Sequence, residues 1–515
     1  MGQPSSYKPL GHNIGRDIGR IGIPLAPLTA LMLYASPPAI ARPPLHFPTH
    51  QVTQATVQPS HLSIDAVDLG GGLGMGDRPK LSVKGFKIHT PFSQQKAESS
   101  ETQYFFERGL ERLQNGDFSG AVEDFNTTLR RLDNEPEAIR NDGSKITPAL
   151  VYYNRGNAYL QLRVVKAAQE NYDRAIELNP NFAHAYINRG VTRRAAGDWD
   201  GAIADYNKAI ELEPNDADIY YNRANVYRIQ GNWDGAIADY SQALSLNPDY
   251  ANAYINRAVI YHHLGNLDQA LADSNAALKI NDTLPEAFYN RGLIRFDQKD
   301  NLGAIADFTQ ALKLQPNNAR AHVKRGTIYY LLKDYQAAQR DYDQAIKLNR
   351  DSAEAYNWRG LTRVAQNQLP QAIADYNAAI NLNADYANAY VNRGIAHHRS
   401  RNYPQAIADY TTAINLDADN PSSHHLRGLS HQASGNLTEA IQNFTRAITL
   451  KSDYADPYVN RAMAYWSQQV TLSGEEQAQL QQSARQDLDR AAALYQAQGN
   501  ESGVALVARV RDRFK

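Results

Sequence analysis

The residues of this chain that could do chemistry recur in rows, and the first row is made of asparagines. Each stands two residues before a small residue that repeats every 34 positions. The members are Asn154, Asn188, Asn222, Asn256, Asn290, Asn392 and Asn460. An amide carries both a donor and an acceptor, so it can pair with any peptide group whatever side chain lies beside it. The row therefore favours contact with an extended peptide; the competing interpretation is local bonding, capping or simple solvation.

A second row pairs arginines with carboxylates that follow them at a constant offset along the chain. The central pairs are Arg189 with Asp205, Arg223 with Asp239, Arg257 with Asp273, and Arg291 with Asp307. A guanidinium matches a carboxylate through two parallel hydrogen bonds. We expect structural ion pairs that join helices within one repeat or between neighbours. The alternative is an anion-binding row, which the nearby carboxylates disfavour.

One further pair, Arg320 and Lys324, lies four residues apart on one predicted helix face and could contact an acidic peptide. The alternative is a solvated face. We include both residues in the predicted peptide-binding set. The histidine doublets, such as His262–His263, diverge on a helix, so we predict core substitution and no metal site.

The spacing of these rows requires two helices in every 34-residue unit. The small residues of the ladder are Gly156, Gly190, Ala224, Ala258, Gly292, Gly326, Gly360, Gly394, Gly428 and Ala462. An aromatic follows the ladder residue at a fixed offset in nearly every unit, with Ser274 as the exception in register. Between them, pairs such as Gly197–Asp198 can end one helix and cap the next. In the last unit, Ser473 to Glu476 has the pattern of a capping box.

This pattern resembles the tetratricopeptide repeat (TPR). The resemblance implies an all-α, right-handed α-solenoid (superhelix) of eleven helix-turn-helix units over 102–499, with a capping helix over 500–515. The Asn-Arg-Gly variant is similar to TPR arrays common in bacteria, cyanobacteria especially. The repeats also resemble those of the O-linked N-acetylglucosamine transferases, where an asparagine ladder on the concave wall grips an extended peptide. We expect no equivalent of their catalytic domain in this sequence.

Composition narrows the function further. The chain has 515 residues, no cysteine and a net charge of −1, and residues 101–515 are acidic. Cysteine chemistry is excluded, and phosphate neutralisation is disfavoured. With no catalytic motif, we expect a non-enzymatic protein-interaction scaffold without cofactors, metals or nucleic acid. The alternatives are an assembly factor or regulatory subunit docking folded partners on its outer faces, or an RNA-binding helical repeat. Self-association stays open.

The first hundred residues differ from the repeats. Residues 1–41 have the order of a signal peptide, with a predicted cut after Ala41. Residues 42–101 are predicted to form a disordered linker rich in Pro, Ser and Gly. This interpretation predicts export to a periplasm, lumen or extracellular space, and otherwise a cytoplasmic protein. The 15-residue apolar stretch is too short to span a bilayer, so we expect no membrane span in the mature chain.

Overall fold

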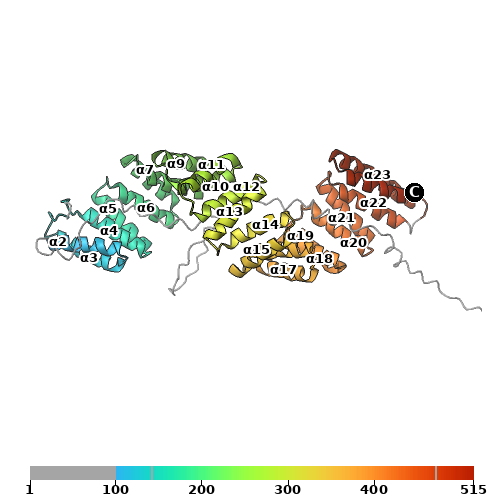
Figure 1. Cartoon of the computed structure of the whole chain (residues 1–515), viewed down its shortest axis with the longest axis horizontal. Helices are drawn as coiled ribbons and strands as arrows, with labels where there is room; N and C mark the ends of the chain where they lie inside the picture. The colour runs from blue at the N-terminus through green and yellow to red at the C-terminus, as the bar shows by residue number, and fades with distance from the viewer. Residues whose placement is uncertain (1–99, 141–142, 470–472, 515) are drawn as a thin grey trace, which may run out of the picture. The chain divides into compact units, whose positions relative to one another are not determined.

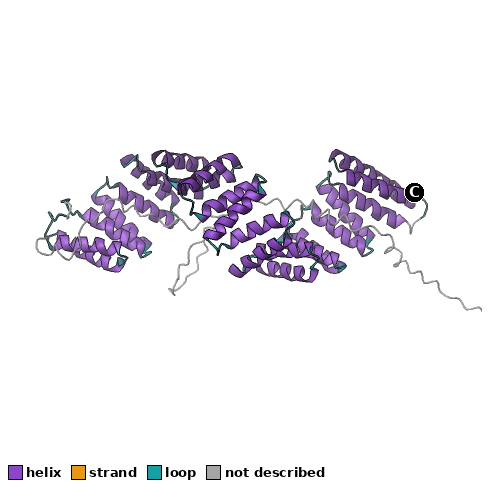
Figure 2. Ribbon diagram, viewed as in Figure 1, coloured by secondary structure: helices purple, strands orange, loops and turns teal. Residues whose placement is uncertain are grey.

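The computed structural model describes residues 100–140, 143–469 and 473–514, and Figure 2 shows helices joined by loops throughout these ranges. The predicted signal peptide lies outside the described residues, as does the predicted linker up to residue 99. The described residues form two compact units. We call residues 100–416 the long unit and residues 417–514 the terminal unit.

The long unit is a series of helix pairs, each a repeat with a first and a second helix (Figure 1). Repeats 1 to 3 are α2 (Glu101–Gln114) with α3 (Phe118–Leu132), α4 (Pro148–Gln161) with α5 (Val165–Leu178), and α6 (Ala183–Ala195) with α7 (Trp199–Leu212). Repeats 4 to 6 are α8 (Ala217–Ile229) with α9 (Trp233–Leu246), α10 (Ala251–His263) with α11 (Leu267–Ile280), and α12 (Pro285–Asp297) with α13 (Asn301–Leu314). Repeats 7 to 9 are α14 (Ala319–Leu331) with α15 (Tyr335–Leu348), α16 (Ala353–Ala365) with α17 (Leu369–Leu382), and α18 (Ala387–Arg399) with α19 (Tyr403–Leu416).

The terminal unit continues the pattern with repeats 10 and 11. These are α20 (Pro421–Ala433) with α21 (Leu437–Leu450), and α22 (Ala455–Gln469) with α23 (Glu475–Ala497). A last helix, α24 (Glu501–Arg513), follows. Within each unit a first helix packs on its own second helix and, where a repeat of the same unit precedes it, on the second helix of that repeat.

The turn inside each repeat follows local backbone chemistry. Gly197 has a φ of +81°, a conformation that a residue with a Cβ adopts reluctantly, and Asp198 caps α7 by accepting a hydrogen bond from the Gly201 amide. Asn266 stands at the equivalent position but makes no side-chain capping bond. The predicted capping box in repeat 11 does not form either, because Gly474 is the N-cap of α23.

The core lies where the ladder residue of a first helix meets the aromatic of its second helix. A Cβ on Gly360 would stand 2.6 Å from Cε1 of Tyr376, so only a residue without a side chain lets the two helices approach this closely. Tyr376 and its equivalents are among the largest fully buried side chains: Tyr172, Tyr206, Tyr240, Tyr342 and Tyr410. This contact explains why the small residue and the aromatic recur together.

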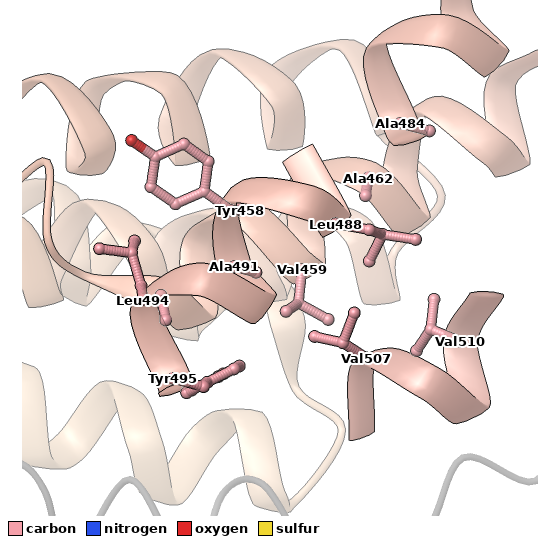
Figure 3. Packing of buried hydrophobic residues seen from close by; sticks show 11 residues of the cluster. Tyr458, Val459, Ala462, Ala484, Leu488, Ala491, Leu494, Tyr495, Val507 and Val510 are labelled. Atoms are coloured by element: carbon pink, nitrogen blue, oxygen red, sulfur yellow. The ribbon is translucent and has the colours of Figure 1, made fainter. Parts of the chain in front are cut away.

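The terminal unit ends in an apolar cluster that includes α24 (Figure 3). Val507 and Val510 of α24 are buried with Val459 of α22 and Leu488 of α23. Phe514 also stacks on Trp466, with ring centroids 4.2 Å apart. The last helix therefore covers apolar surface of repeat 11, as the end of a repeat array requires. No described helix is long and apolar enough to cross a bilayer.

Candidate functional site

The predicted arginines and aspartates form two-pronged ion pairs that also reach a third helix. Arg257 donates from Nε to Asp273 Oδ2 and from Nη2 to Oδ1, both at 2.8 Å. Its Nη1 donates to Ser241 Oγ, 2.8 Å away on the second helix of the preceding repeat. One guanidinium thus joins α9, α10 and α11.

The other three central pairs repeat this geometry. Each arginine binds the aspartate on the second helix of its own repeat and a polar residue on the second helix of the preceding repeat. These sets are Arg189 with Asp205 and Asp173, Arg223 with Asp239 and Asn207, and Arg291 with Asp307 and Asn275. The bonds fall within a repeat and between neighbours at once, so these guanidinium groups already hold protein partners and are poorly suited to binding an external anion.

Electrostatics around these carboxylates follow from burial and from their partners. At Asp341, burial favours the neutral acid, but hydrogen bonds from Arg325 and His322 outweigh it and hold the pKa of that carboxyl below its usual value. Arg325 spans repeat 7 as Arg257 spans repeat 5, reaching Thr309 through Nη1. The charged form is therefore the one the fold uses here.

The asparagine row divides into two kinds of position. Asn188 is fully buried, and its Nδ2 donates to Tyr153 Oη at 3.2 Å and to Asn157 Oδ1 at 2.8 Å. Asn256 does the same, two repeats later, to the equivalent residues Tyr221 (3.2 Å) and Asn225 (3.0 Å). Asn392 and Asn460 also donate to the first helix of the preceding repeat, to Asn357 Oδ1 at 2.9 Å and to His425 Nε2 at 2.8 Å.

These inter-repeat asparagines follow a series that falls on every second repeat. In repeat 7 the same position holds Lys324 in place of asparagine. Its Nζ binds Glu354 Oε1 of the next repeat at 2.9 Å. Burial lowers the pKa of Lys324, but the Glu354 carboxylate outweighs it and leaves that pKa above its usual value. Arg320 is exposed, so the predicted basic pair reduces to one available cation.

The alternate positions in the row behave differently. Asn154 is buried and donates to Leu150 O within its own helix at 2.8 Å. Asn222 and Asn290 are half-buried, and within the described ranges their amides make no hydrogen bond. Asn154 and Asn188 therefore do not present their amides to solvent, whereas the amides of Asn222 and Asn290 have donors and acceptors that no other described residue occupies.

The cause lies on the preceding first helix. Three residues before the ladder residue, an acceptor such as Tyr153 or Tyr221 alternates with Ile187 or Ile255. Asn188 and Asn256 follow the repeats that offer a hydroxyl, whereas Asn222 follows the repeat with Ile187 and Asn290 the repeat with Ile255. The alternation is visible in the sequence, but a search for the length of a single repeat passes over it.

An aromatic contact follows the same alternation. At Phe182 and Tyr250, the residue before the first helix packs its ring against the tyrosine of the preceding repeat, tilted in the first case and stacked in the second. Phe182 lies 4.8 Å from Tyr153, and Tyr250 lies 4.7 Å from Tyr221, between ring centroids. We call the interfaces between repeats 2 and 3 and between 4 and 5 closed, and those between repeats 3 and 4 and between 5 and 6 open.

Family models identify the class of protein to which this array of helix pairs belongs. A model described as TPR repeat matches residues 192–228, 224–265, 292–333, 360–400, 402–435 and 431–469. Models described as tetratricopeptide repeat match residues 149–182, 319–352, 171–204 and 251–283. Repeats of this kind are generally non-catalytic modules that bind protein partners, and they define a protein-interaction scaffold. The chain belongs to the tetratricopeptide-repeat family.

Solved structures of other repeat proteins are similar to parts of the chain. The TPR protein YrrB is 24% identical over 36% of this chain and 96% of its own, with a TM-score of 0.32. A tetratricopeptide repeat protein from Parabacteroides merdae is 19% identical over 48% of this chain and 98% of its own, with a TM-score of 0.39. Yeast Tom70 is 16% identical over 80% of this chain and 96% of its own, with a TM-score of 0.37.

Proposed function

We propose that this protein is a scaffold that holds an extended segment of a partner protein along the first helices of its long unit. Asn222 and Asn290 are its amide contacts, and the chain does no chemistry of its own. The observation that carries the proposal is the contrast within the asparagine row. Asn188 and Asn256 are held by Tyr153 and Tyr221, whereas Asn222 and Asn290 are half-buried with no hydrogen bond in the described residues.

The half-buried amides of Asn222 and Asn290 are only partly hydrated. A polar group that has lost part of its hydration without gaining a protein partner costs free energy, and a peptide group supplies the missing donor and acceptor together. The open interfaces place such amides two repeats apart on α8 and α12. We therefore narrow the predicted peptide-binding set to Asn222 and Asn290 and give Asn256, Asn392 and Asn460 a role in joining repeats.

The test is co-purification of partners from the native host with the full chain as bait. One variant carries Asn222→Ala and Asn290→Ala, and the matched control carries Asn317→Ala in an exposed loop. We expect all three baits to melt alike, and only the double variant to lose the partner. A partner that stays on the double variant refutes the amide contacts.

A second candidate function is docking of a folded partner on the second helices. It is favoured by Leu302 on α13, whose side chain is 76% exposed. Exposed leucines also end several second helices: Leu178, Leu314, Leu348, Leu382 and Leu416. Leu302→Asp as a further bait separates the two functions, because only docking on the second helices predicts that it loses the partner.

A further inference from the structure

Arg228 is a nearly buried cation that makes no ion pair with another described residue. It lies in the last turn of α8, and its residue surface is 8% exposed. Its Nε is buried without a hydrogen bond, and no ion pair of its guanidinium is found within the described ranges. The arginines of the ion-pair row, by contrast, each bind a carboxylate or an amide on a second helix, as Arg223 binds Asp239 on the neighbouring α9.

Arg194 stands at the equivalent position one repeat earlier, in the last turn of α6. Its Nε is also buried without a hydrogen bond, and so is the hydroxyl of Tyr206 on α7. Burial raises the pKa of Tyr206, and the charge of Arg194 opposes that rise, so the two groups are close enough to interact. Among the described residues, Arg228 in repeat 4 and Arg194 and Tyr206 in repeat 3 thus each have a buried polar atom without a hydrogen bond.

Within the described residues, neither Arg194 nor Arg228 forms an ion pair with a carboxylate. The next member of the register, His262, is bonded to Asp297 with its Nε2 2.7 Å from Oδ2. Asp200, on α7, accepts a hydrogen bond from Gln230 at 3.0 Å. The helix dipole at the end of α8 offsets part of the Arg228 charge, but an unpaired buried guanidinium remains costly. A bound anion would remove that cost.

We propose that Arg194 and Arg228 form an anion site that takes a carboxylate of the partner segment, either a side-chain carboxylate or the chain end. This inference rests on the proposed function, because the segment is the one held at Asn222. Arg228 follows Asn222 by six residues on α8, about 9 Å along the helix, which about three extended residues span. The partner segment is therefore acidic or carboxy-terminal near the open interface of repeats 3 and 4.

The test uses fluorescence polarisation with the full chain and three labelled twelve-residue probes. The first alternates Ser and Glu and is amidated at its end, the second alternates Ser and Gln and is amidated, and the third is the second with a free carboxyl end. We expect the first or the third to bind at least about tenfold more tightly than the second. Which of the two binds identifies the source of the carboxylate.

Variants connect that preference to the site. Arg228→Gln should reduce the ratio of affinities to about one, and Arg340→Gln, an exposed arginine on α15, should leave it unchanged. Equal affinities for all probes, no binding of either carboxylate probe, or an unchanged ratio in Arg228→Gln overturns the anion site.

A thermal melt separates this role from a structural one. Arg228→Met keeps an apolar stem and removes an unpaired charge, so the melting temperature without probe should hold or rise. A clear fall would overturn the site, because it would mean that the guanidinium already has a structural partner. If the Ser-Gln probe binds through Asn222 and Asn290 but carboxylates give no advantage, the anion site fails and the proposed function stands. If carboxylate probes are preferred but the Asn222→Ala, Asn290→Ala variant binds every probe normally, the proposed function fails and the anion site stands.

Discussion

Replacing Arg257 with alanine should loosen three helices at once. The side chains of Arg257 and Asp273 are 17% and 8% exposed, so the substitution leaves a nearly buried carboxylate without its partner. Breaking a buried pair from one side costs about 3–5 kcal/mol. The loss at Ser241 adds little, because its hydroxyl already donates to Ile237 O at 2.6 Å.

The assay is hydrogen exchange of the full chain, read in peptides from α9, α10 and α11. Stability in a repeat array is a sum of local terms, so the loss should be concentrated in repeats 4 and 5. The expected cost corresponds to an increase of about two to three and a half powers of ten in the local opening constant.

The control is Arg174→Ala, which removes an exposed bridge to Glu177 whose side chains are 52% and 62% exposed. Such an exposed bridge adds little to stability, because water and salt screen the two charges. If Arg257→Ala destabilises the chain no more than this control does, the arginine row does not hold the helices together. Joint replacement by Arg257→Met and Asp273→Leu should cost much less than Arg257→Ala, because no unpaired charge remains.

Three other predictions concern the core and its titration. Gly360→Ala should cost about 1–3 kcal/mol in a melt, because its Cβ would overlap the Tyr376 ring, and an unchanged melt would contradict that contact. Tyr240→Phe should lower the stability by about 1 kcal/mol, because it removes the hydroxyl that donates to Asn225 on α8. Tyr206→Phe should leave the stability unchanged, because the Tyr206 hydroxyl has no hydrogen bond among the described residues. Equal losses of stability in the two variants would argue against the alternation between repeats. Burial lowers the pKa of His425 to about 3, so the terminal unit should lose stability as the pH falls from about 6.5 toward 3. The loss from this group should be at most about 1.4 kcal/mol per pH unit. His425→Phe should remove this pH dependence, measured as the local opening of the terminal unit by hydrogen exchange.

Much of the fold could be predicted from spacing alone. A small residue in every repeat, followed by an aromatic at a fixed offset, requires two helices that approach closely, and the contact between Gly360 and Tyr376 shows that approach. The arginine and aspartate rows could be paired because they keep the same offset. Their third bond, such as Arg257 to Ser241, could not, because Ser241 is one of several residue types that fill this position.

The candidate site was less predictable, because the role of each asparagine depends on the repeat before it. Asn188 and Asn222 occupy the same place in their repeats, but only Asn188 meets a tyrosine. Lys324 looked available next to Arg320, but its partner Glu354 stands in the following repeat. The period of a single repeat conceals differences that recur in every second one.

The most direct test compares two pairs of asparagines on the same background. Asn222→Ala with Asn290→Ala, and Asn188→Ala with Asn256→Ala, would each be measured for melting temperature and for affinity to the co-purified partner by calorimetry well below the melt. We expect the first pair to lose affinity with an unchanged melt, and the second to lower the melt and keep affinity. Equal effects of both pairs on binding, or no effect of the first pair, would contradict a peptide contact restricted to the open interfaces.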